Sequence, residues 1–159
     1  MKLTHTDEHG NARMVDVGQK PMTERSAVAE GWILMGPDAC LAVRERSAKK
    51  GDVLAVAQLA GIQAAKRTSD LIPLCHPLPI TSVRVDLALD EERAGVRAVA
   101  TVAAHWRTGV EMEAMTAASA AALTIYDMLK GTERGIVIEA LRLLEKKGGR
   151  SGHWTRPGS

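Results

Sequence analysis

The sequence has almost no aromatic residues. Its 159 residues include three Trp, one Tyr and no Phe, so aromatic side chains make up only 3% of the chain. Proteins that bind single-stranded nucleic acids stack the bases on several aromatic side chains, and this chain can offer few of them. Its core must therefore be built from Ala, Val, Leu, Ile and Met, which allows secondary-structure elements to pack closely.

The chain also lacks an excess of charge of either sign. It has 21 Lys and Arg against 19 Asp and Glu, a net charge of +2. Binding to duplex DNA or RNA requires a concentrated basic face that neutralises phosphates. We therefore expect no nucleic-acid partner, although local basic clusters can still hold a small anion.

Cysteines and long apolar runs are scarce as well. Cys40 and Cys75 form neither a C-x-x-C pair nor a disulfide framework. The first ten residues are polar and charged, unlike a signal peptide, and no apolar run is long enough to span a bilayer. We expect one soluble domain over residues 1–159, located in the cytoplasm and without a membrane partner.

The hydrophobic pattern predicts an α+β fold. Apolar residues alternate with polar ones in strands and recur every three to four residues in helices. The predicted elements are a strand over 25–35, a helix that begins at Asp52, a hairpin of strands over 83–90 and 96–104, a helix over 109–130 and a strand over 136–144. This order is typical of a ferredoxin-like split β-α-β sandwich, an antiparallel sheet with helices packed on one face. Residues 1–23 are expected to form an extended arm, and residues 148–159 a mobile tail.

Two local patterns refine the ends of the second helix. Thr108 and Glu111 match an S/T-x-x-E capping box, which assigns Glu111 a structural role at the start of the helix. Gly131 matches the left-handed glycine that often ends a helix. Glu113 has no such structural role. Its carboxylate is either solvated near the helix dipole or free to accept hydrogen bonds from the edge of a nucleobase or pterin.

The segment 71–79 is unusually rich in proline. Prolines at 73, 77 and 79 hold the backbone around Cys75 and His76 in a stiff, extended conformation. His76 is thus either a well-placed hydrogen-bonding group or part of a rigid connecting loop. The remaining Cys and His residues supply no evident set of zinc ligands beside this pair, so we expect no metal site; they are Cys40, His5, His9, His105 and His153.

Basic and acidic residues meet at two further places. Asp127 and Lys130 are three residues apart on a helix, a spacing that fits either a surface ion pair or a pair that transfers protons. Lys50 directly precedes the helix that begins at Asp52, where an anion is readily bound. Glu113 and Asp127 lie 14 residues apart on one helix, or about 21 Å. If both serve one substrate, a second subunit must supply one of them, which predicts a symmetric oligomer with sites at its interfaces.

These motifs together resemble those of the cyclic pyranopterin monophosphate synthases, the accessory protein C family of molybdenum-cofactor biosynthesis. The resemblance lies in eight segments that follow the family order along the chain: residues 3–7, 14–17, 50–53, 60–66, 71–78, 108–114, 123–128 and 148–152. It implies a ferredoxin-like subunit in a hexamer of three dimers. It also implies a lyase that converts 3′,8-cyclo-7,8-dihydro-GTP, made by the pathway's radical-SAM enzyme, to cyclic pyranopterin monophosphate and pyrophosphate.

The resemblance also implies roles for individual residues. Asp127 is the expected catalytic acid or base, with Lys50 and Lys130 beside it. The expected substrate contacts are Leu74, Cys75, His76, Met112 and Glu113, with Arg25 and Lys20 as candidates for the triphosphate. No cofactor is required, because the reaction is a rearrangement with loss of pyrophosphate, but a divalent cation could accompany the triphosphate.

Two other functions compete with this one on the residues alone. A ferredoxin-like module that binds a nucleotide without turning it over would use Asp127 and Lys130 merely as a surface pair. A metal-dependent hydrolase would use Cys75 and His76, and would require stoichiometric zinc.

Overall fold

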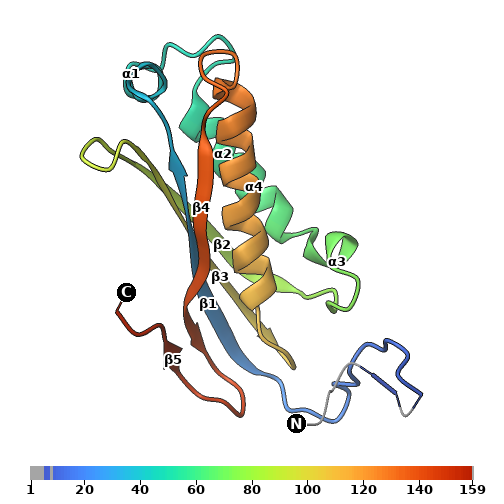
Figure 1. Cartoon of the computed structure of the whole chain (residues 1–159). Helices are drawn as coiled ribbons and strands as arrows, with labels where there is room; N and C mark the ends of the chain where they lie inside the picture. Colours follow the sequence, from blue (N-terminus) through green and yellow to red (C-terminus); the bar gives the residue numbers. More distant parts are fainter. Residues whose placement is uncertain (1–5, 8, 159) are drawn as a thin grey trace.

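Five strands form one antiparallel sheet in the order β2-β3-β1-β4-β5 (Figure 1). The computed structural model describes residues 6–7 and 9–158. In chain order its elements are β1 (Thr23–Leu34), α1 (Pro37–Arg44), α2 (Val53–Ala65), α3 (Thr68–Leu71), β2 (Ile80–Asp90), β3 (Gly95–Trp106), α4 (Glu111–Leu129), β4 (Val137–Lys147) and β5 (Trp154–Thr155).

The sheet confirms the predicted ferredoxin-like arrangement. Strands β2 and β3 form the predicted hairpin, and β1 lies between β3 and β4. The two long helices α2 and α4 lie side by side on the same face of the sheet, and no helix of the described residues covers the other face (Figure 1). The described chain contains no helix that is long and apolar enough to cross a membrane.

The core between the helices and the sheet consists mainly of small side chains. Alternate residues of β3 point toward the helices and are fully buried; they are Val96, Ala98, Ala100, Val102 and Ala104. Helix α4 meets them with buried alanines at 114, 117, 118, 121 and 122. The low aromatic content of the sequence is therefore explained, because alanine-rich surfaces let the elements approach closely.

Helices α2 and α4 come closest at Gly61. A Cβ atom added there would lie 2.9 Å from the carbonyl oxygen of Ala117 and 3.1 Å from a methyl group of Val85. Real Cβ atoms hardly ever approach a backbone oxygen so closely. Gly61 therefore sets the distance between the two helices.

Several local predictions are wrong. The sequence pattern also did not predict helix α1, which begins soon after β1 with Gly36 as its N-cap and Pro37 in its first turn. Residue 108 does not cap α4, because the N-cap is Val110 and no side chain caps it; Glu111 instead forms an ion pair with Lys146 of β4. Gly131 does not have the left-handed conformation, since α4 ends at Lys130 with right-handed backbone angles.

The two terminal segments carry more structure than their composition indicates. In the arm, Thr6 pairs with Ala12, and Asp7 accepts hydrogen bonds from the backbone of His9 and Asn11. Where the sequence predicts only a mobile tail, Trp154–Thr155 forms strand β5 along β4. The first motif of the resemblance, at 3–7, includes Leu3 and His5, which lie outside the described residues.

The contact at Gly61 leads to a stability prediction. Gly61→Val is expected to lower the free energy of unfolding by about 1–3 kcal/mol, because the added atoms overpack the contact with α4. Urea unfolding at fixed protein concentration measures this change. Gly131→Ala is the control, since a Cβ at residue 131 meets nothing within 4 Å. Equal stability of Gly61→Val and wild type would show that α2 and α4 are not held at this distance.

Candidate functional site

Two lysines converge on Asp127 at the C-terminal end of α4. Lys50 Nζ lies 2.7 Å from Asp127 Oδ2, and Lys130 Nζ lies 2.6 Å from Asp127 Oδ1. Lys50 Nζ also donates to the backbone oxygen of Asp127 at 3.0 Å. Each of the three side chains is about half exposed. The structure thus brings together all three residues that were predicted to be catalytic.

The fold explains how Lys50 reaches a residue so far along the chain. Gly51, with a φ angle of +100°, turns the backbone directly after Lys50. Asp52 then caps α2 by accepting a hydrogen bond from the Ala55 amide at 3.1 Å. Because α2 starts beside the point where α4 ends (Figure 1), the residue before α2 lies next to Asp127.

The lysines keep the Asp127 carboxylate ionised. Hydrogen bonds from Lys130 and Lys50 lower the pKa of Asp127 to about 2. The hydrogen bond with Asp127 in turn raises the pKa of Lys130 above its ordinary value. Near neutral pH this end of α4 therefore carries two ammonium groups against one carboxylate, an arrangement suited to a phosphate-bearing ligand.

The predicted substrate contacts meet in a second place, at the N-terminal end of α4. Six of them line one cavity of about 380 Å³: Lys20, Leu74, Cys75, His76, Met112 and Glu113. They come from three segments of the chain, namely the N-terminal arm, the proline-rich segment before β2 and the first turn of α4. The stiff backbone around His76 thus forms one wall of a cavity, as a binding site requires.

Glu113 is the unusual group of this cavity. Its side chain is only 4% exposed. Burial, together with the nearby charge of Glu111, raises the pKa of Glu113 to about 7, although a backbone hydrogen bond opposes the shift. Near neutral pH this carboxyl group can therefore either donate or accept a proton or hydrogen bond. That ability suits the amide and amino edge of a guanine or pterin.

Burial also keeps the neighbouring thiol neutral. Desolvation and the charge of Glu113 raise the pKa of Cys75 above its ordinary value. A cysteine that binds zinc must be a thiolate, and no group of three or more His, Cys, Asp or Glu side chains within residues 6–7 and 9–158 is arranged to hold a metal ion. The site therefore gives no support to the metal-dependent hydrolase.

A basic cavity of about 760 Å³ adjoins the first one, with Lys20, Thr108, Gly109 and Glu111 lining both. Arg25 also lines it, but this side chain is 9% exposed and donates to the backbone oxygen of Trp106 at 3.3 Å. Residues 149–151 of the tail also line this cavity. Gly149 is favoured there, because its φ angle of +73° is a conformation that side chains rarely adopt, and it lies against the Arg25 guanidinium.

Sequence reasoning missed Arg107 and Lys146, which both line the basic cavity. Arg107 Nη1 donates to the backbone oxygens of Gly18 and Lys20, the latter at 3.1 Å, and so ties the N-terminal arm to the start of α4. The charge of Arg107 was visible in the sequence. Nothing in the pattern indicated that it contacts a segment almost 90 residues away.

The two groups of predicted residues are not in contact within one chain. No member of the Lys50–Asp127–Lys130 cluster lines either cavity. Glu113 and Asp127 both belong to α4, and 14 residues of helix separate them by about 21 Å.

Comparisons with known proteins identify the family of the chain. The model of the MoaC family matches residues 14–149. A protein of Thermomicrobium roseum is 57% identical over 155 residues, covering 98% of this chain and 93% of its own. One of Brucella ovis is 56% identical over 153 residues, covering 96% and 93%. One of Cereibacter sphaeroides is 57% identical over 152 residues, covering 96% of both chains. All three are named cyclic pyranopterin monophosphate synthase.

The buried Glu113 leads to a pH-dependent stability prediction. Its folded-state pKa of about 7 exceeds the ordinary value of 4.5, so the folded protein holds a proton that the unfolded chain releases. This contribution to stability is fully present below pH 4.5 and is lost as the pH rises through about 7. Glutamine is neutral at every pH. The free energy of unfolding of Glu113→Gln is therefore expected to equal that of wild type near pH 5 and to exceed it at pH 8 by up to about 3 kcal/mol.

Urea unfolding at the two pH values tests this prediction. Glu92→Gln, which changes an exposed carboxylate in a turn, is the matched control. It is expected to change the free energy of unfolding by the same amount at both pH values. A difference between Glu113→Gln and wild type that is the same at pH 5 and pH 8 would show that Glu113 is not the titrating group.

Proposed function

Because the chain belongs to the MoaC family, we propose that it is a lyase that converts 3′,8-cyclo-7,8-dihydro-GTP to cyclic pyranopterin monophosphate and releases pyrophosphate. This reaction is an early step of molybdenum-cofactor biosynthesis. The observation that carries the proposal is the pair of ammonium groups on Asp127, 2.7 Å and 2.6 Å from its two carboxylate oxygens. The same residues, identified from the sequence motifs, come together from two separate segments of the chain.

The lysines act on the charge of the triphosphate. Two cations against one carboxylate leave an excess positive charge. This charge stabilises the negative charge that develops on the pyrophosphate as it leaves. Held by Asp127, both ammonium groups are already in place before substrate arrives, so little reorganisation is needed during the reaction. Lys130 and Lys50 are also the proton donors nearest to that carboxylate.

Asp127 acts on protons only as a base. Its pKa of about 2 means that it carries no proton to donate near neutral pH. It holds both lysines in place and, because it is ionised, can accept a proton during the reaction. Proton transfer of this kind accompanies the opening of the imidazole ring and the closing of the pyrazine ring.

The cavity around Glu113 receives the base of the nucleotide. Its buried carboxyl pairs with the amide and amino edge, as acidic side chains do with nucleobases. His76 and Cys75 form the wall behind that edge. The adjoining basic cavity, with Lys20, Arg25, Arg107 and Arg150, receives phosphate oxygens.

The active site is completed by a second copy of the chain. About 21 Å separates Glu113 from Asp127 along α4, which is farther than one small substrate reaches along a helix. The family resemblance implies a homo-oligomer, namely a hexamer of three dimers. In this assembly the lysine cluster of one chain lies against the cavity of another.

The proposed reaction requires no resident cofactor, because substrate and product differ by rearrangement and loss of pyrophosphate. A divalent cation that arrives with the triphosphate could assist the leaving group. The substrate comes from the radical-SAM enzyme of the pathway. A cytoplasmic location is part of the same proposal.

A coupled assay tests the proposed function. Purified protein receives the cyclic dihydro-GTP made by the radical-SAM partner, and pyrophosphate and pterin are measured. Wild type is expected to form both products, and Lys130→Ala to lose at least about 100-fold in turnover, because one cation beside the leaving group is gone. Lys49→Ala, which changes an exposed neighbour of Lys50, is the control and is expected to remain active. Tight binding by wild type without product would instead support a module that binds nucleotide without catalysis.

A further inference from the structure

The open face of the sheet holds a large cavity lined by arginines. Its volume is about 730 Å³, within the range of small-molecule sites. Four arginines and two glutamates line it: Arg93, Arg97, Arg142, Arg156, Glu30 and Glu145. It shares no residue with the two cavities of the proposed active site. We call it the arginine cavity.

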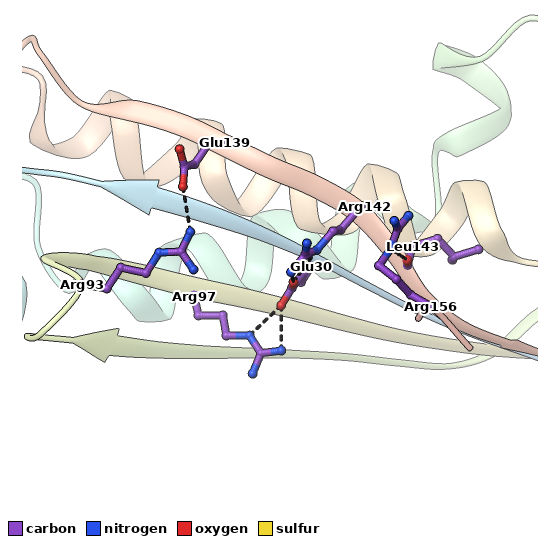
Figure 2. Close-up of polar contacts among 7 residues, drawn as sticks. All are labelled: Glu30, Arg93, Arg97, Glu139, Arg142, Leu143 and Arg156. Atoms are coloured by element: carbon purple, nitrogen blue, oxygen red, sulfur yellow. Dashed lines mark hydrogen bonds and ion pairs between the residues drawn. The ribbon is translucent and has the colours of Figure 1, made fainter. Parts of the chain in front are cut away.

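A buried carboxylate organises the centre of this cavity. Glu30 of β1 is 2% exposed and receives two guanidinium groups from opposite sides (Figure 2). Arg97 of β3 contacts Oε2 at 2.7 Å, and Arg142 of β4 contacts Oε1 at 2.6 Å. Both arginines donate through Nε and Nη2, and neither Nη1 atom has an acceptor among the described residues. One carboxylate thus fixes two cations and neutralises only one of them.

A strained bulge places the second of these arginines. Strict alternation from Glu139, which lies opposite Trp32, would turn Arg142 toward the helices. One extra residue in β4 puts Arg142 opposite Glu30 instead, and Ala140 has a φ angle of +50° at this point. Bulges of this kind re-aim side chains at a cost in backbone strain. Here the bulge brings Arg142, a second cation, to the Glu30 carboxylate, which already pairs with Arg97.

Two more arginines extend the cavity on either side. Arg93, from the turn after β2, stacks 3.9 Å above the Trp32 ring and pairs with Glu139 at 2.8 Å. Arg156, after β5, donates to the backbone oxygen of Leu143 at 2.7 Å (Figure 2). The other acid of the cavity, Glu145, already contacts Lys147 and His153. Of the residues that line the cavity, four carry a positive charge and two carry a negative charge.

We propose that the arginine cavity is a second anion site, which binds a phosphorylated small molecule through Arg142, Arg97, Arg93 and Arg156. Guanidinium groups bind phosphate through paired, planar hydrogen bonds. Glu30 acts as a positioning residue, because it holds two of these groups in fixed orientation before the ligand arrives. The proposal is independent of the catalytic function, since the cavity lies on the face of the sheet away from α2 and α4.

Calorimetric titration with sodium pyrophosphate at low ionic strength tests the site. The whole chain carries Lys130→Ala in every sample, which weakens binding at the proposed active site and leaves the arginine cavity unchanged. The Lys130→Ala protein is expected to bind pyrophosphate. Adding Arg142→Gln is expected to weaken the affinity for pyrophosphate about tenfold or more, because a charge-assisted contact is lost. Arg84→Gln is the matched control, because Arg84 pairs with Asp86 elsewhere on the sheet, and is expected to leave binding unchanged.

Folding and mass are measured in parallel by circular dichroism and light scattering. If Arg142→Gln does not fold, Arg93→Gln decides the question, with a several-fold loss of affinity expected. Absence of binding, or equal affinity in all variants, would overturn the proposal. A third result would also overturn it: the parent binds no pyrophosphate, and Arg142→Gln forms a smaller assembly than the parent. The cavity would then be an interface between copies of the chain.

Discussion

The close contact between α2 and α4 is the constraint on which the rest of the structure depends. Gly61 leaves no room for a side chain beside the Ala117 carbonyl, and both helices contribute buried alanines to the common core. At that distance the start of α2 lies next to the end of α4, so Lys50 meets Asp127. A packing requirement between two apolar helix faces thus assembles a charged cluster at their common end.

The two ends of α4 have opposite electrostatic character. At its C-terminal end, two ammonium groups lower the pKa of Asp127 to about 2 and leave an excess positive charge. At its N-terminal end, burial raises the pKa of Glu113 to about 7 inside a cavity. The first environment suits phosphate and a leaving group, and the second suits the polar edge of a base. In the proposed function, the two are complementary parts of one nucleotide site, which a single chain keeps apart.

Much of this could be predicted from local pattern, and the failures have physical causes. Alternation and helical periodicity located the hairpin of β2 and β3 and both long helices, because one face of each is buried. The capping box failed because Glu111 pairs with Lys146, a contact made only in the folded chain. Strand β5 and the tie from Arg107 to the arm depend on distant segments in the same way. The motifs named Lys50, Asp127 and Lys130, but only the fold shows that they touch.

Complementation between two inactive variants tests the central claim, that the ends of α4 from different chains form one active site. Lys130→Ala and Glu113→Ala are each assayed alone for pterin formation and then after being unfolded and refolded together. If each site takes Lys130 from one chain and Glu113 from another, random pairing restores roughly one quarter of the wild-type sites. A mixture as inactive as its two components, although it assembles to the wild-type mass, would show that each chain works alone and would contradict the account.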